Sequence, residues 1–106
     1  MSRIVATQSD NGAVLQARTG DEVVIRLSEV PTTGFRWDIE NAASNVTSLG
    51  SDFEPAAGAG MGGGGTRTFR FRAHSPGQAL LSLRLRRAWE GDRGATERYL
   101  ITIQIS

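Results

Sequence analysis

Apolar and polar side chains alternate along most of this chain, and this pattern restricts its fold more than any other feature. The C-terminal segment shows it most clearly, since Tyr99, Ile101, Ile103 and Ile105 alternate with the polar Arg98, Thr102 and Gln104. A period of two places apolar side chains on one face of a β-strand, whereas helical periodicity is hard to find here. The alternation therefore predicts half-buried strands and an all-β chain.

Five segments carry the alternation clearly and three carry it weakly. The clear segments are 21–28, 35–40, 69–73, 79–86 and the segment from residue 98 to the end; the weaker ones are 3–8, 14–17 and 46–53. Turn signals rich in Gly, Pro, Asp and Asn separate them. Seven or eight short strands at this spacing predict an immunoglobulin-like antiparallel β-sandwich. We expect a single domain, residues 1–106, because a division at the glycine-rich segment 58–65 would leave two unstable halves.

The residue types present exclude most catalytic and metal chemistry. The chain has no cysteine and one histidine, and all twelve of its basic residues are arginine. Thiol nucleophiles, thiolate metal sites, lysine Schiff bases and the P-loop lysine are therefore absent. His74 lies between a predicted strand and the turn 75–77, where we interpret it as a surface residue, and one histidine offers no readable Ser-His-Asp set. We expect no enzyme, no catalytic residue, no metal and no cofactor.

The net charge and the distribution of apolar stretches say little about where in the cell the protein is located. Twelve basic and eleven acidic residues give a net charge of +1, which provides no long-range attraction to nucleic acid or to an anionic membrane. No stretch approaches the ~20 apolar residues that span a bilayer. No N-terminal apolar run resembles a signal peptide, so we expect a cytoplasmic protein by default, or a periplasmic or secreted one if a signal has been removed.

Three connections between predicted strands have unusual compositions. The segment Val30–Phe35, VPTTGF, fits an ordinary hairpin turn, because proline and glycine suit tight turns. The segment Gly58–Gly65 contains Gly-x-Gly-x-x-Gly, but a strand follows it, so we reject a dinucleotide-binding turn. A flexible connection or a backbone that approaches another surface closely would explain these glycines. Trp89 ends a strand, either as a lid on the core or as an interface hot spot.

The predicted strand order allows all three connections to lie at the same end of the sandwich. There they would form one continuous surface, with a proline-stiffened turn between a glycine loop and a loop that carries Trp89. Phe35 and Trp37 would anchor the base of the turn in the core or at its edge. This arrangement favours a wedge that enters a cleft.

These three segments resemble, in order, the motifs of the chagasin family, protein inhibitors of papain-like cysteine peptidases. Val30–Phe35 matches Asn-Pro-Thr-Thr-Gly-aromatic, residues 62–65 match Gly-x-Gly-Gly before a strand, and residues 87–89 match Arg-Pro-Trp. Val30 replaces the family's asparagine and Ala88 its proline. The similarity covers nearly the whole chain, including the segments GDEVVIRL and ERYLITIQI. The resemblance implies that the peptidase-binding residues are Pro31, Thr32, Thr33, Gly34, Phe35, Gly62, Gly63, Gly64, Gly65, Arg87 and Trp89.

The resemblance implies reversible, non-covalent inhibition of a papain-like cysteine peptidase, from the same organism or a foreign one. Thr32 and Thr33 would enter the catalytic cleft, residues 62–65 would pair with the peptidase main chain, and Trp89, assisted by Arg87, would contact an aromatic surface. We expect a monomer that binds neither nucleic acid nor membrane. The alternative is a non-catalytic binding sandwich with an arginine-rich face for an acidic polymer, formed by Arg70, Arg72, Arg84 and Arg86.

Overall fold

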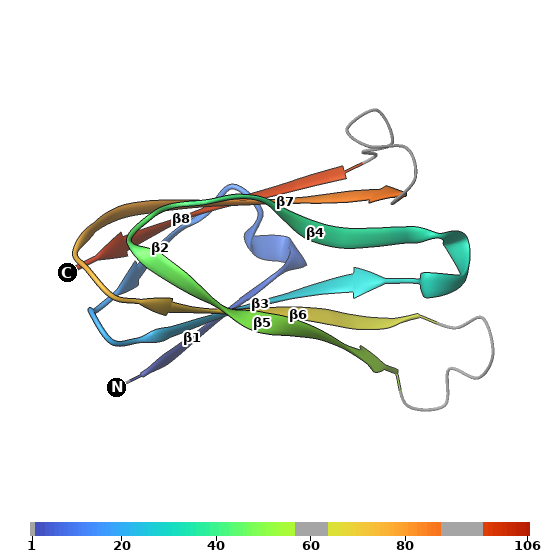
Figure 1. Ribbon diagram of the computed structural model, residues 1–106, viewed down its shortest axis with the longest axis horizontal. Helices are drawn as coiled ribbons and strands as arrows, with labels where there is room; N and C mark the ends of the chain where they lie inside the picture. Colours follow the sequence, from blue (N-terminus) through green and yellow to red (C-terminus); the bar gives the residue numbers. More distant parts are fainter. Residues whose placement is uncertain (1, 57–63, 88–96) are drawn as a thin grey trace.

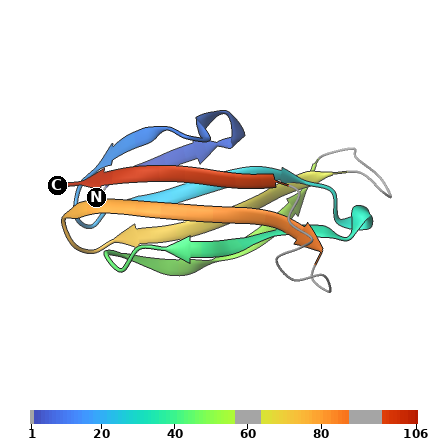
Figure 2. The same cartoon turned by 90° about the horizontal axis from the view of Figure 1, so that it is seen from above.

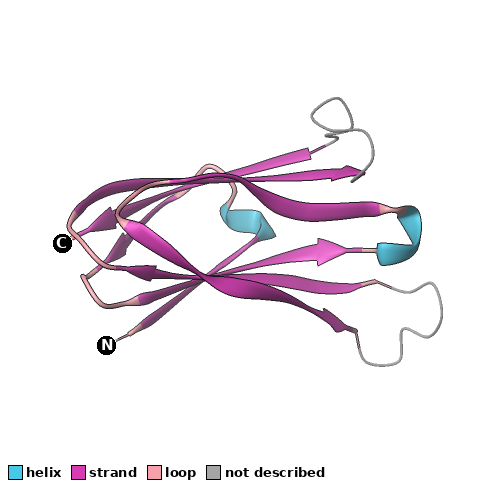
Figure 3. Cartoon of the chain, viewed as in Figure 1, coloured by secondary structure: helices cyan, strands magenta, loops and turns pink. Residues whose placement is uncertain are grey.

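The computed structural model describes residues 2–56, 64–87 and 97–106 (Figure 1). In this part of the chain, each segment predicted as a strand is one, and two short 3-10 turns join strands (Figure 3). The 3-10 turns are η1 (Gln8–Asp10) and η2 (Pro31–Thr33). The strands are β1 (Arg3–Thr7), β2 (Val14–Ala17), β3 (Glu22–Glu29), β4 (Phe35–Ala42), β5 (Val46–Pro55), β6 (Gly65–Ala73), β7 (Gly77–Arg87) and β8 (Glu97–Ile105).

The strands form two four-stranded sheets that pack face to face (Figure 1). Sheet A has the order β1-β3-β6-β5 and sheet B the order β2-β8-β7-β4; Figure 2 looks down onto sheet B. This confirms the predicted β-sandwich. Among the strand pairs of the described residues, however, β1 with β3 and β2 with β8 are parallel, and the other four are antiparallel. The chain changes sheets between β1 and β2, and each of these two strands forms the edge of its own sheet beside a strand that runs in the same direction.

The core lies between the two inner faces and follows the predicted alternation. In β8, Tyr99, Ile101 and Ile103 are at most 1% exposed, and the large side chains of β3, β6 and β7 meet them from both sheets. The Tyr99 hydroxyl donates a hydrogen bond to the Thr7 carbonyl oxygen at 2.8 Å, and burial raises the pKa of Tyr99 to about 12. This core makes the sandwich a firm base for its connections.

Val24 departs from simple alternation, because it lies on the outer face of sheet A and is nevertheless buried. It occupies the central strand β3, with Val5 beside it on β1 and Arg70 beside it on β6. Side chains directly opposite each other in a sheet lie close enough to cover one another. Its neighbours on the two flanking strands therefore shield Val24 from solvent.

The two ends of the described chain lie together, at the end of the sandwich opposite η2 (Figures 1 and 2). The Ser2 backbone N–H donates to Asp21 Oδ1 at 2.9 Å, and the Arg18 N–H donates to Asp21 Oδ2 at the same distance. These backbone donors hold the pKa of Asp21 below its usual range. The Asp21 carboxylate thus fastens the beginning of β1 to the body of the sheet.

Candidate functional site

The strand ends that flank the three unusual segments lie together at one end of the sandwich (Figure 1). Within sheet A, Gly65 is paired with Glu29 on one side and with Pro55 on the other. Within sheet B, Arg87 is opposite Phe35, and Glu97 is opposite Leu85. The ends flanking all three connections thus share this end, as the strand order led us to expect. We call it the loop end; Gly62, Gly63 and Trp89 lie outside the described residues.

The first connection is a compact turn that crosses from sheet A to sheet B. Pro31 begins η2, where its missing N–H costs nothing and its fixed φ favours the turn. The Thr33 N–H donates to the Val30 carbonyl oxygen at 3.1 Å, and the Gly34 N–H donates to the Pro31 carbonyl oxygen at 3.0 Å. Gly34 has a φ of 83°, in the left-handed region that glycine adopts without strain. Proline and glycine therefore each have a defined conformational task.

The two threonines of the turn differ in what their hydroxyl groups do. Thr33 Oγ1 donates to the Val30 carbonyl oxygen at 2.7 Å and accepts the Phe35 N–H at 3.3 Å. Thr32 is exposed, and its hydroxyl makes no hydrogen bond to any residue that the structure describes. Thr33 therefore shapes the turn, while the Thr32 hydroxyl is available to a partner.

A buried carboxylate lies at the base of the turn. Glu29 Oε1 accepts the Trp37 backbone N–H at 2.7 Å, and Glu29 Oε2 lies 2.7 Å from the Arg67 terminal nitrogen. The Arg67 Nε also contacts both carboxylate oxygens, at 3.3 and 3.2 Å. The Trp37 indole N–H donates to the Ser28 carbonyl oxygen at 2.9 Å. Glu29, Trp37 and Arg67, which we call the base clamp, thereby join β3, β4 and β6.

Phe35 and Arg87 connect the first segment to the third. The guanidinium carbon of Arg87 lies 4.7 Å from the centre of the Phe35 ring, within the range of a cation–π interaction. Phe35 is half-buried and Trp37 is buried, which confirms their expected positions at the base of the turn. The expected partnership of Arg87 with Trp89 stays a prediction, and the structure adds a contact of Arg87 with the first segment.

The two described glycines of the second segment are packed against their neighbours. A Cβ atom on Gly65 would overlap the Glu54 carbonyl oxygen and lie 2.8 Å from the Cα atom of Pro55. A Cβ atom on Gly64 would lie 3.2 Å from a methyl carbon of Val30. Since Gly65 has a paired strand on each side, we expect a partner's main chain to pair with residues that precede it.

A hollow of about 330 Å³ opens beside η2, between the two sheets. It brings together residues from the turn, from β3 and from the distant ends of β7 and β8. Its walls are mainly apolar around Phe35, with the exposed Glu97 at one side. Its lining consists of Gln8, Ser28, Glu29, Val30, Thr33, Phe35, Leu85 and Glu97. The loop end therefore offers a concave surface next to the projecting turn.

The arginine-rich face proposed as an alternative site is not supported. Arg70 and Arg72 belong to sheet A, whereas Arg84 and Arg86 belong to sheet B, so the four occupy opposite outer faces. Asp38 pairs with both Arg84 and Arg86, at 3.2 and 2.9 Å.

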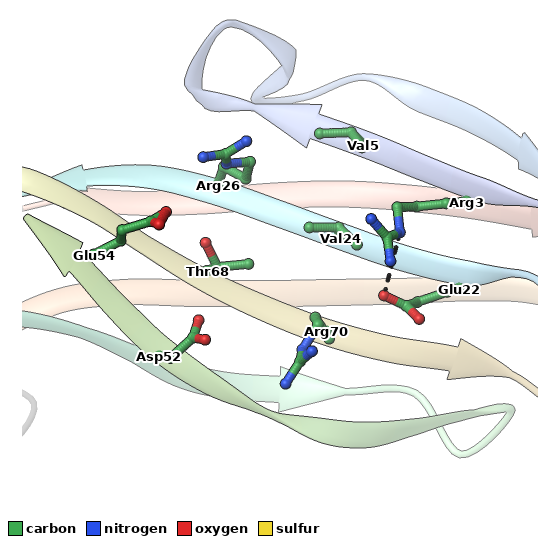
Figure 4. A pocket seen from close by; sticks show the side chains of 9 residues that line it. All are labelled: Arg3, Val5, Glu22, Val24, Arg26, Asp52, Glu54, Thr68 and Arg70. Atoms are coloured by element: carbon green, nitrogen blue, oxygen red, sulfur yellow. Dashed lines mark ion pairs between the residues drawn. The ribbon is translucent and has the colours of Figure 1, made fainter. Parts of the chain in front are cut away.

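Around Arg70, the outer face of sheet A carries mixed charges (Figure 4). A shallow hollow of about 250 Å³ there contains three arginines and three carboxylates, and Arg3 pairs with Glu22 at 3.5 Å. Neighbouring carboxylates cancel much of the attraction that an acidic polymer needs.

Other kinds of site find no support in the part of the chain that the structure describes. His74 is exposed directly after β6, as expected, and its backbone N–H donates to the Asn45 carbonyl oxygen at 3.1 Å. No group of three His, Asp or Glu side chains among the described residues could hold a metal ion. No helix among them is long and apolar enough to cross a membrane.

Sequence reasoning missed Glu29 and Arg67 of the base clamp, although alternation contained the signal for them. Glu29 continues the inward-facing row of Val23, Ile25 and Leu27, and Arg67 continues that of Phe69 and Phe71. Two opposite charges at inward positions of neighbouring strands indicate a buried ion pair, because an unpaired buried charge is very costly.

Comparisons with known proteins agree with this fold. The structure is similar to a cysteine protease inhibitor from Entamoeba histolytica, with a TM-score of 0.87 and 20% sequence identity over 100% of this chain and 97% of that one. Its similarity to amebosin has a TM-score of 0.79 and 19% identity over 98% of each chain. For PbICP-C, solved in complex with falcipain-2, the values are 0.65 and 14%, over 98% of this chain and 89% of that one. A search of curated proteins found no match.

A family model matches most of the chain. Residues 16–103 match the model described as "Chagasin family peptidase inhibitor I42". The match includes β3 to β7 whole and the first segment with its base clamp. It agrees with the expectation that the protein inhibits an enzyme and is not one itself. The chain therefore belongs to the chagasin family of peptidase inhibitors.

Proposed function

We propose that this protein inhibits papain-like cysteine peptidases reversibly and without covalent chemistry, by inserting the turn Pro31–Gly34 into the catalytic cleft. The observation that carries the proposal is that the two threonine hydroxyls have different roles. Thr33 and the backbone bonds of η2 hold the turn from inside, while Thr32 is exposed and its hydroxyl has no hydrogen-bond partner among the described residues. A turn held in this way loses little conformational entropy when it binds.

The turn is also a poor substrate for the peptidase that it would block. Its backbone is folded into a 3-10 turn, with the Val30 and Pro31 carbonyl oxygens occupied by internal hydrogen bonds. Pairing with the main chain of another protein requires an extended segment. The firm turn therefore favours occupation of the cleft over extended binding and cleavage.

The neighbouring segments would widen the contact on both sides of the turn. Gly62, Gly63 and Gly64 would approach the peptidase main chain, and Trp89 with Arg87 would contact an apolar surface beside the cleft. The position of Arg87 on the Phe35 ring supports this, since it brings the end of β7 next to the turn. A typical interface of this kind buries ~1,600 Å² in total, and its affinity depends on preorganisation more than on area.

The mixed charges of both outer faces leave the loop end as the surface best suited to a partner. We therefore propose a monomer whose partner is a papain-like cysteine peptidase, with PbICP-C and its falcipain-2 complex as a structural precedent. A monomer suits this role, because self-association through the loop end would cover the projecting turn.

The test is a titration of papain and of a cathepsin L-type peptidase, with hydrolysis of a fluorogenic peptide as the readout. We expect tight, reversible inhibition that is recovered on dilution, and no inhibition of a trypsin-like serine peptidase. A Thr32→Arg variant provides the matched comparison. It adds bulk at the exposed tip without touching the internal bonds of the turn, so it should fold as the wild type does and inhibit less. Failure of the folded wild type to inhibit at micromolar concentration would overturn the proposal.

A further inference from the structure

The connection from β3 to β4 crosses between the sheets, and this raises the question of what holds its base. β3 belongs to sheet A and β4 to sheet B, so no ladder of backbone hydrogen bonds joins them. The strands of an ordinary hairpin would supply such a ladder. Here side chains supply the connection: Glu29 binds the Trp37 N–H at 2.7 Å, and the Trp37 indole N–H binds the Ser28 carbonyl oxygen at 2.9 Å.

We infer that Glu29 and Arg67 are positioning residues for inhibition, whose buried ion pair holds the turn Pro31–Gly34 in its binding conformation and in register with the start of β6. This inference rests on the proposed function. Arg67 lies two residues after Gly65, and Glu29 directly precedes Val30. The base clamp therefore ties the first segment to the second as well as closing the base of the turn.

The burial of the base clamp supports a positioning role. The Glu29 side chain is 1% exposed and the Arg67 side chain 16% exposed. A well-packed apolar pair often stabilises a fold as well as a buried ion pair does, because desolvation of the charges offsets much of their attraction. An apolar pair cannot supply directional hydrogen bonds. Here the Glu29 carboxylate accepts from the Trp37 backbone N–H of sheet B, and the forked Arg67 guanidinium of sheet A holds the carboxylate in place. Fold stability alone therefore does not account for this pair.

Arg67 is itself held from its other side, which limits the positions that it can adopt. Its guanidinium carbon lies 5.3 Å from the centre of the Phe53 ring on β5. The Glu29 carboxylate and this ring thus fix the guanidinium between them. The resulting chain of contacts runs from β5 through β6 and β3 to β4, beneath both the first and the second segments.

A positioning role predicts a particular kinetic signature. Without the base clamp, a smaller fraction of molecules would hold the turn in the conformation that binds, and the apparent dissociation constant would rise by the inverse of that fraction. The bound state would be little changed, so the loss would fall on the association rate constant. A residue that acts only on global stability would leave both rate constants unchanged while the protein is folded.

The experiment compares Glu29→Gln and Arg67→Lys with the wild type, using stopped-flow inhibition of papain at 25 °C. Asp38→Asn is the matched control. It neutralises a carboxylate that directly follows Trp37 on β4 but pairs with Arg84 and Arg86 on the outer face of sheet B. Hydrogen exchange of the Trp37 amide is followed in parallel, since Glu29 covers that N–H. Arg67→Lys keeps the charge and tests the inference even if Glu29→Gln does not fold.

We expect the association rate constant to fall about tenfold in Glu29→Gln and less in Arg67→Lys, with faster exchange at Trp37 and little change in dissociation. Asp38→Asn should match the wild type within about twofold. The inference fails if the base-clamp variants inhibit as the wild type does, if the loss falls on dissociation, or if Asp38→Asn loses as much. Absence of inhibition by the wild type itself would instead overturn the proposed function, and this inference with it.

Discussion

Replacement of each threonine of the turn by valine should separate the shaping of the turn from the binding of a partner. Valine keeps the branched Cβ and nearly the same volume, and it replaces the hydroxyl by a methyl group. In Thr33→Val, two hydrogen bonds are lost, at 2.7 Å to the Val30 oxygen and at 3.3 Å from the Phe35 N–H. Both groups lie at the surface, where water replaces part of the loss, so we expect the free energy of unfolding to fall by about 1 kcal/mol. In Thr32→Val no described intramolecular bond is lost, and the change should stay within about 0.5 kcal/mol.

Urea unfolding, followed by the fluorescence of the buried Trp37, measures this difference, and a thermal scan should show a drop of roughly 4–8 °C for Thr33→Val. Inhibition of papain, measured on the same preparations, should weaken about fivefold in Thr32→Val, the loss of one hydrogen bond to the partner. A Thr33→Ser variant, which keeps the hydroxyl, is the control and should recover most of the stability. The reasoning is refuted if Thr32→Val is the less stable variant, or if Thr33→Val unfolds as the wild type does.

Three further predictions concern packing and pH. Gly65→Ala should lower the free energy of unfolding by about 1–3 kcal/mol in urea, because its Cβ would meet the backbone of Glu54 and Pro55; Gly64→Ala, with milder contacts, is the control, and equal losses would contradict the packing argument. Tyr99 has a raised pKa of about 12 in the folded protein, so the stability it provides is present below its ordinary value of 10.0 and is lost as the pH rises toward 12. A Tyr99→Phe variant should show a shallower alkaline decline in its unfolding midpoint, and parallel declines would exclude this role. The pKa of Asp21 is lowered in the folded protein. The stability that Asp21 provides is therefore present above pH 3.8, its ordinary pKa, and is lost as the pH falls through the pKa of the folded state. The difference in thermal midpoint between the wild type and Asp21→Asn should therefore shrink below pH 4, and a constant difference would contradict the assignment.

Alternation predicted the strands and most of the core, because the inner face of a sheet demands apolar side chains at every second residue. Alternation does not predict the relative direction of neighbouring strands. The parallel pairing of β1 with β3 and of β2 with β8 therefore could not be predicted. Alternation also could not assign strands to sheets. Arg70 and Arg84 look alike along the chain, and only the topology separates them onto opposite faces.

The sequence predicted the motifs of the candidate site, but not the ion pair of the base clamp that supports the turn. Pro31 and Gly34 have strong conformational preferences of their own, so the turn is visible in the sequence. The base clamp depends on contacts between residues that are far apart, since Glu29 and Arg67 are separated by 38 positions. A polar residue in an inward register carries this information only once the neighbouring strand is known.

The placement of the chain ends opposite the loop end has a practical consequence. The molecule measures 42 Å along its longest dimension, and the ends of the described chain lie at the far side of it from the projecting turn (Figure 1). A tether attached at either Ser2 or Ser106 would therefore leave the loop end open, so that the protein could be immobilised on a sensor or fused in tandem. Two copies joined by a flexible linker that spans two anchored peptidases would gain avidity from a high effective concentration, without a single new contact.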